Sequence, residues 1–259
     1  MTLQQPACSK VLIPERWDEC NSCSYREDGS FSLYGKYGEI MKILLHMPHT
    51  SLKVPRFFFK GLKISKEEFR KYNLEMTDLG IDELFKDYKF TKVIAKYSRL
   101  FLDVERFKDD ELEVMSKVGE GVVYTHSYDT KLFHEHDLKY KKKVLKYYDK
   151  YHNKLDRVAK RLLKKDDELL IIDCHSFSDK MASHFFKPPF PDICIGVEEE
   201  YYDKEILDSL TKEIKELGYS YEINYPYKGS LVPNIIYDKK IKYKKVVSIM
   251  LEINKRIYL

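Results

Sequence analysis

Residues 169–176, Leu-Leu-Ile-Ile-Asp-Cys-His-Ser, join four apolar residues to a polar end that contains Asp173, His175 and Ser176. Four consecutive apolar residues predict a strand that is covered on both faces, as in a parallel sheet. Ligands of open α/β sheets bind just beyond the carboxyl ends of the strands. His175 is therefore a candidate metal ligand or general base. The alternative is a histidine that only caps the strand through hydrogen bonds.

Further segments on both sides of this stretch alternate between strand and helix patterns. Apolar residues at helical intervals predict helices in 137–165 and 203–217, and within 65–88 with a break near 77–80. Ser65, followed by Glu68 three residues later, predicts a capping box at the start of the 65–88 region. Short apolar runs predict strands at 39–47, 92–95, 99–104, 169–173, 192–196, 219–224 and 246–253. This alternation predicts an α/β protein, a three-layer αβα fold with a mostly parallel mixed sheet.

Length and composition indicate a folded protein that needs no disulfide framework. The 259 residues are 43% hydrophobic and 34% charged, which is typical of globular domains. No apolar stretch reaches the length of a membrane span, and the amino-terminal residues lack the pattern of a signal peptide. Five cysteines, an odd number, suit a reducing compartment. We therefore expect a cytoplasmic protein without a membrane partner.

The first 38 residues differ in composition from the rest of the chain. They contain three of the five cysteines and the only tryptophan. Cys20 and Cys23 form a CxxC pair with Cys8 upstream, but no fourth ligand for a zinc knuckle follows at a suitable spacing. We expect residues 1–38 to be an extension that packs on the main domain, and residues 39–259 to form that main domain.

Lysine is abundant, and the predicted helix at 137–165 is especially rich in it. The formal net charge is only +4, because acidic residues nearly balance the basic ones along the chain. A basic surface for nucleic acid is one interpretation, and a solvated helix face is the other. The charge balance favours the second, so no nucleic-acid partner is expected.

Three predicted strands place chemically active side chains near one edge of the sheet. His49 follows the strand at 39–47, His175 follows the strand at 169–173, and Glu252 lies within the strand at 246–253. A buried glutamate requires a charged partner, a metal or a raised pKa; the alternative is a glutamate on the wet face of an edge strand. Two histidines and a carboxylate are typical ligands of a hydrolytic zinc, and a further carboxylate serves as the base. We expect one zinc ion per chain, bound by both histidines, with Glu252 as the catalytic base.

The third zinc ligand and the substrate-binding groups follow less directly. Asp78 is the preferred acidic ligand, with Asp173 and Asp82 as alternatives. Arg99 and Arg106 flank a predicted strand, where guanidinium groups suit an acidic substrate, although for Arg99 a surface ion pair is the favoured interpretation. The segment 224–229 is typical of either a binding loop or a plain turn, and Asn224 and Lys228 are its candidate substrate-binding residues.

From residue 43 to the end, the sequence resembles the N-formylglutamate amidohydrolase family. The resemblance rests on an ordered series of short motifs, among them Met-Pro-His-Thr-Ser at 47–51, Thr77-Asp78, Leu-Asp-Val-Glu-Arg at 102–106, Ile-Asp-Cys-His-Ser-Phe at 172–177 and Glu-Ile-Asn-Lys-Arg at 252–256. It implies a phosphorylase/hydrolase-like fold similar to that of zinc carboxypeptidases. It also implies a metal-dependent amidohydrolase that cleaves a linear amide, with a small acidic N-acyl amino acid as substrate.

Four residues depart from the patterns of the related families. Thr50-Ser51 replaces a small pair that is often Ser-Gly, and Glu105 precedes Arg106 where an asparagine is familiar. Leu52 stands where carboxypeptidases have a ligating glutamate, which is why the third ligand is sought at Asp78. These departures leave a second hypothesis open, a non-catalytic binding or regulatory protein on the same fold with a decayed metal site.

Overall fold

The computed structural model describes residues 23–25, 31–34, 40–163, 168–238, 240, 243 and 245–259, without the side chains of residues 23–25, 31–34 and 40. Within these residues the strands are β1 (Cys23–Tyr25), β2 (Phe31–Tyr34), β3 (Ile40–Met47), β4 (Thr91–Ile94), β5 (Glu168–Phe177), β6 (Ile193–Val197), β7 (Tyr221–Ile223) and β8 (Lys245–Asn254). The α-helices are α1 (Lys66–Glu75), α2 (Ile81–Leu84), α3 (Leu138–Leu162), α4 (Asp179–Ala182) and α5 (Lys204–Glu216). Short 3-10 helices are η3 (Arg56–Gly61), η4 (Val114–Val118), η5 (Glu199–Tyr201), η6 (Asn234–Tyr237) and η7 (Lys255–Ile257).

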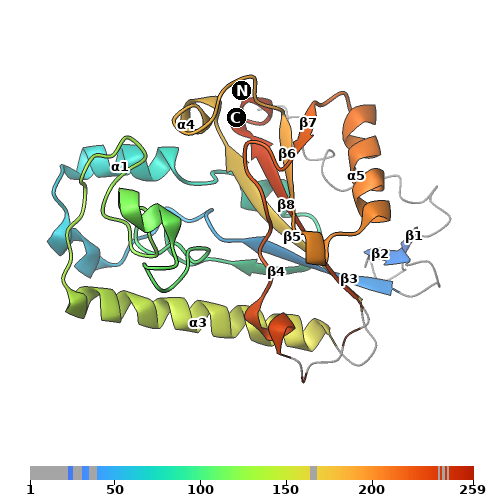
Figure 1. Ribbon diagram of the computed structural model, residues 1–259, viewed down its shortest axis with the longest axis horizontal. Helices are drawn as coiled ribbons and strands as arrows, with labels where there is room; N and C mark the ends of the chain where they lie inside the picture. The colour runs from blue at the N-terminus through green and yellow to red at the C-terminus, as the bar shows by residue number, and fades with distance from the viewer. Residues whose placement is uncertain are drawn as a thin grey trace.

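A single mixed sheet forms the middle of the molecule (Figure 1). Its strand order is β1-β2-β3-β5-β8-β6-β7, and β4 also pairs with β3. Strands β4, β3, β5 and β8 run parallel to one another, and β6 pairs antiparallel with β8. β5 and β8 therefore lie in the interior of the sheet, and every residue of β5 is buried.

Alternate residues of the strands face two separate apolar cores. One core packs Leu44 and Ile171 against α3 residues such as Leu155, and the other packs Leu45 and Ile172 with side chains that include α5 residues. Figure 1 accordingly shows α3 and α5 on opposite sides of the sheet. The expected three-layer αβα arrangement with a mostly parallel mixed sheet is confirmed.

The helices begin where the sequence predicts. The Ser65 side chain accepts a hydrogen bond from the backbone N–H of Glu68 at 3.1 Å, which caps α1. Asp137 caps α3 through the N–H of Tyr140. The predicted break near residues 77–80 separates α1 from α2, and Gly80 there has a φ of 84°, in the left-handed region that glycine favours.

The predicted strand at 99–104 is wrong, because these residues form turns between β4 and η4. They are nevertheless buried, with Leu100 and Phe101 in the apolar core. The N–H groups of Phe101 and Leu102 donate to the carbonyl of Ser98, and that of Asp103 donates to Val122. The stretch is apolar because it fills the core, while turn hydrogen bonds satisfy its backbone.

The predicted extension at residues 1–38 falls largely outside the described residues, as do Cys8 and Cys20. Of this segment, β1 and β2 form an antiparallel hairpin, and β2 pairs with the beginning of β3. Among the described residues, no helix is both long enough and apolar enough to cross a membrane.

Candidate functional site

Three donor atoms from separate segments converge at the carboxyl ends of β3 and β5. The Nδ1 atoms of His49 and His175 are 3.3 Å apart, and Asp78 Oδ2 lies 3.7 Å from the first and 3.1 Å from the second. A tetrahedral zinc ion with bonds of about 2.0–2.1 Å places neighbouring ligand atoms about 3.3 Å apart. The spacing and the chemistry of these three atoms therefore fit one face of a zinc coordination tetrahedron.

The other nitrogen of each imidazole faces a different carboxylate. His49 Nε2 is hydrogen bonded to Asp103 Oδ1 at 2.8 Å. His175 Nε2 lies 3.0 Å from Asp173 Oδ1, an ion-pair approach without hydrogen-bond geometry. A carboxylate on the distal nitrogen is the usual device that fixes the tautomer and orientation of a metal-binding histidine. This arrangement leaves both Nδ1 atoms free to face Asp78.

The buried charges shift one another's pKa values. Burial alone would raise the pKa of Asp103, but His49 and Arg99 hold it well below its usual range. Burial alone would lower the pKa of His175, but the carboxylates of Glu105 and Asp173 raise it well above 6.5. Several carboxylates therefore surround His49 and His175, and they favour a positive charge between these residues.

A series of hydrogen bonds runs from Asp173, beside His175, to helix α3. Asp173 Oδ1 is 2.7 Å from His46 Nδ1, and His46 Nε2 is 2.7 Å from the Tyr151 hydroxyl of α3. Asp173 Oδ2 also accepts from the N–H of Leu231 at 3.1 Å. Although His46, Asp173 and Glu105 are close enough to form a second metal-binding group, both nitrogens of His46 already have partners. We therefore interpret these hydrogen bonds as holding Asp173 in place beside His175.

Glu252 lies beside His175, because β8 pairs with β5 and the two residues are directly in register. β8 is an interior strand, so the alternative of a wet edge strand is wrong. Glu252 is 9% exposed, and its Oε2 atom has no hydrogen-bond partner among the described residues. Burial raises its pKa to about 7, partly offset by His175. A carboxylate of that pKa is suited to both accepting and donating a proton near neutral pH.

Two arginines are joined to the centre through Asp103. Arg99 Nη2 donates to Asp103 Oδ2 at 2.9 Å, and Arg106 Nη2 donates to the Tyr124 hydroxyl at 3.4 Å. Tyr124 in turn donates to Asp103 at 2.9 Å. Both arginines retain a buried Nε that lacks a hydrogen-bond partner among the described residues, although Arg106 Nε lies 3.6 Å from Asp103 Oδ2 in an ion pair. Arg106 was predicted to follow a strand. It lies instead in the turn segment after residue 104 and reaches the site from there.

All eight predicted site residues line one pocket of about 780 Å³, namely His49, Asp78, Arg99, Arg106, His175, Asn224, Lys228 and Glu252. Asn224 and Lys228 are exposed on the loop after β7. Asn224 Oδ1 accepts from the N–H of Val197 at 2.9 Å, so this side chain also holds its own loop in place. The structure thus brings the predicted residues together, and their individual roles remain predictions.

Of the alternative acidic ligands, Asp82 lies exposed in α2 and does not line the pocket, whereas Asp173 faces the Nε2 side of His175. Sequence reasoning missed Glu105 as a site residue. Its carboxylate oxygens lie 3.6 Å from His49 Nε2 and 3.3 Å from His175 Nε2, and these three residues form another group that could hold a metal. The only signal for Glu105 in the sequence was that it precedes Arg106 at a position where the related family commonly has asparagine.

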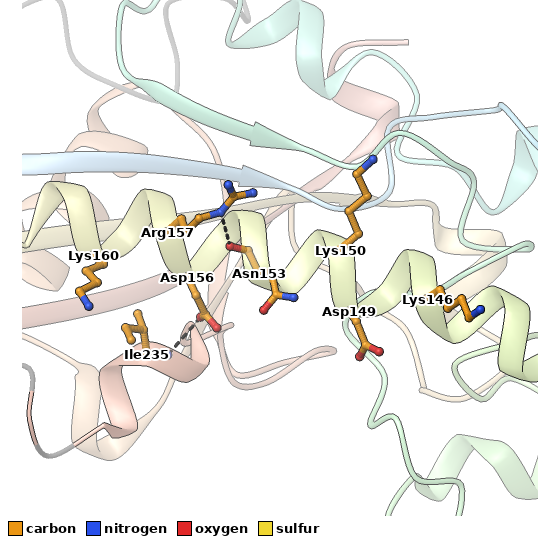
Figure 2. A pocket seen from close by; sticks show the side chains of 8 residues that line it. All are labelled: Lys146, Asp149, Lys150, Asn153, Asp156, Arg157, Lys160 and Ile235. Carbon is orange, nitrogen blue, oxygen red and sulfur yellow. Dashed lines mark hydrogen bonds between the residues drawn. The ribbon is translucent and has the colours of Figure 1, made fainter.

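A separate hollow runs along the outer face of α3 (Figure 2). Basic side chains there alternate with Asp149, Asn153 and Asp156, and Lys150 points away from Asp149. Asp156 accepts from the N–H of Ile235 at 3.1 Å. Acidic and basic side chains therefore mix in this hollow, and both the solvated helix face and the absence of a nucleic-acid partner remain predictions.

Comparisons with known proteins agree with this architecture. The sequence model described as N-formylglutamate amidohydrolase matches residues 41–259. The crystal structure of N-formylglutamate amidohydrolase from Ralstonia eutropha is similar with a TM-score of 0.66 and 18% identity, over 85% of this chain and 84% of that one. A gene product of Agrobacterium tumefaciens is similar with a TM-score of 0.56 and 16% identity, over 83% and 80% of the two chains. No match was found among curated protein sequences. The structural likenesses establish a shared fold.

Proposed function

Because the chain belongs to the N-formylglutamate amidohydrolase family, we propose that it is a zinc-dependent hydrolase that cleaves the amide bond of an N-acyl acidic amino acid. The observation that carries the proposal is the convergence of His49 Nδ1, His175 Nδ1 and Asp78 Oδ2 beside the buried carboxylate of Glu252. The presence of all these elements favours an intact site over a decayed one. All of them line the same pocket.

His49, His175 and Asp78 would hold the zinc ion. The chemistry that zinc supplies when bound is Lewis acidity, which polarises a carbonyl and lowers the pKa of an attacking water to about 7. Asp103 and Asp173 orient the two imidazoles from their Nε2 sides. We prefer Asp78 to Glu105 as the third ligand, because Asp78 faces the two Nδ1 atoms whereas Glu105 faces the two Nε2 atoms.

Glu252 would act first as the base and then as the acid. Its carboxylate accepts a proton from the attacking water and then delivers it to the amide nitrogen as the bond to the acyl carbon breaks. The raised pKa of about 7 supports this double role, since the protonated and ionised forms then coexist near neutral pH.

Arg99 and Arg106 would bind the carboxylates of the amino-acid part of the substrate. Both keep a buried Nε without a hydrogen-bond partner among the described residues, and guanidinium groups pair with carboxylates in a fork geometry. Lys228 on the exposed loop adds a further positive charge at the pocket. This set of cations supports an acidic substrate.

The direct test combines metal analysis with hydrolysis of defined substrates. The purified protein should contain about one zinc per chain and should hydrolyse N-formylglutamate or N-acetylglutamate. Chelation should abolish the activity, and added zinc should restore it. A protein that binds no zinc from an excess at neutral pH and hydrolyses neither compound would support the non-catalytic alternative instead.

A matched pair of variants tests the choice of the third ligand. Asp78→Asn should lower zinc affinity by more than about 100-fold, whereas Glu105→Gln should stay within the roughly 10- to 100-fold that loss of an outer partner produces. Competition with a zinc-binding dye measures both affinities. If Glu105→Gln shows the larger loss, Glu105 is the third ligand.

A further inference from the structure

The pocket is much larger than a formyl group and its amide require. Its volume of about 780 Å³ lies in the range of about 300–1,000 Å³ that holds a drug-sized ligand. The arginines and the proposed zinc ligands account for only part of its lining. The remainder includes aromatic side chains that follow β5 and β7, and the proposed mechanism gives them no role.

The order of the strands separates the arginines from these aromatic residues. Across the sheet, His49 follows β3, His175 lies in β5 and Glu252 lies in β8. Arg99 is joined to the His49 side through Asp103. On the other side of Glu252, Cys194 of β6 is in register with it, and Cys194 Sγ donates to the carbonyl of Tyr227 at 3.1 Å. His175 and Glu252 therefore lie between the His49 side, to which Arg99 is joined, and the Tyr227 loop.

Four rings form a continuous aromatic wall at the Tyr227 end, which we define as Phe177, Phe186, Tyr225 and Tyr227. Tyr227 packs edge-on against Phe177 and Phe186, with centroids 5.7 and 5.5 Å apart, and Phe186 packs edge-on against Tyr225 at 6.1 Å. All four line the pocket. Neighbouring Phe185 also lines it and is 51% exposed, so apolar surface remains open on this side.

The wall is held rigidly against the end of β8. Arg256 donates to both Asp179 at the start of α4 and Asp192 before β6, and to the carbonyl of Phe190. Asn254 adds a hydrogen bond to Asp179 at 2.7 Å. The segment that carries Phe186 is thereby tied at both ends to the last residue of β8 and to η7, which follows it. A preformed apolar surface beside a catalytic centre is the usual form of a specificity pocket.

We propose that the aromatic wall binds the acyl group of the substrate, so that this protein prefers an acidic amino acid with a bulky aromatic or branched N-acyl group over the N-formyl compound. The inference rests on the proposed function, because it assigns the arginine end of the pocket to the amino-acid carboxylates. That assignment leaves the acyl group to extend from the reacting centre toward Tyr227.

The test compares N-phenylacetylglutamate, N-formylglutamate and N-formylphenylalanine. The kcat/KM for the phenylacetyl compound should exceed that for the formyl compound by about tenfold or more. Phe186→Ala should remove most of this preference by lowering the kcat/KM for the phenylacetyl compound. Tyr202→Ala, which alters an exposed tyrosine outside the pocket, serves as the control.

A binding measurement keeps the result independent of turnover. In zinc-loaded Glu252→Gln protein, calorimetry should give a Kd for N-phenylacetylglutamate that is about tenfold lower than for N-formylglutamate, and adding Phe186→Ala should remove the difference. If this binding preference is found but no compound is hydrolysed, the aromatic wall binds the acyl group as proposed, and the proposed hydrolase activity is wrong. If N-formylglutamate or N-formylphenylalanine is the preferred substrate and ligand, the wall does not bind the acyl group.

Discussion

Glu252 concentrates the proposed chemistry in one side chain. Glu252→Gln keeps the size of the residue but removes its ability to accept a proton, so kcat should fall by about 100- to 10,000-fold. Zinc content should not change, because Glu252 is not a proposed ligand. Steady-state kinetics and elemental analysis measure the two effects, with Glu222→Gln on the exposed part of β7 as the control. A variant that keeps more than about a tenth of wild-type kcat would show that another group is the base.

His134 should make the fold sensitive to acid. It is fully buried, its Nε2 bonds the carbonyl of Phe58 at 3.0 Å, and its Nδ1 has no partner among the described residues. Burial lowers its pKa from 6.5 to about 4. Between these two values the unfolded chain binds more protons than the folded one, so stability is full above pH 6.5 and is lost as the pH falls toward 4.

His134→Gln retains a donor for Phe58 but cannot titrate in this range. Urea unfolding at pH 7.5 and 4.5 should therefore show a smaller loss of stability for this variant than for wild type, by up to about 3 kcal/mol. His184→Gln alters an exposed histidine and should behave like wild type. Equal losses in wild type and His134→Gln would mean that this buried imidazole does not contribute.

Most strands and helices could be predicted from the sequence. Buried strands consist of apolar runs, and packed helices have apolar residues at helical intervals. The run at 99–104 misled the prediction, since its burial comes from core packing, and Asp103 within it makes bonds to His49, Arg99 and Tyr124. The convergence of Asp78 with His175 depends on the path of the chain between α1 and α2, which periodicity does not encode. Glu105 was not predicted for the same reason. It lies in a turn, and periodicity does not encode the path of a turn.

Helix α3 should owe its stability to its packed face. Leu155 is fully buried against the sheet, whereas Leu138 at the start of the same helix is 76% exposed. Leu155→Ala should therefore cost about 2–5 kcal/mol of unfolding free energy, and Leu138→Ala should cost less than about 0.5 kcal/mol. Urea denaturation of both variants measures the contrast. Similar losses in the two would contradict the packing of α3 on this face.

For the molecule as a whole, zinc binding should couple to folding. The proposed ligands come from three segments, after β3, before α2 and within β5, so a bound ion holds them together only in the folded state. Free zinc at 100 times its Kd should stabilise the protein by about 2.7 kcal/mol, raising Tm by roughly 5–10 °C. Thermal melts with and without zinc measure this shift, which should be much smaller for Asp78→Asn. An equal shift in both proteins would place the zinc elsewhere.

The position of β8 also bears on how the protein is made. β8 comes after β5 and β6 in the chain, yet it inserts between them in the sheet and carries Glu252 into register with His175 and Cys194. A nascent chain that has emerged only as far as β7 has neither this interior strand nor Glu252, the proposed base. Long-range strand pairing of this kind is slow to form. Hydrolytic competence should therefore arise only after synthesis has passed β8, which keeps the incomplete polypeptide inactive on the ribosome.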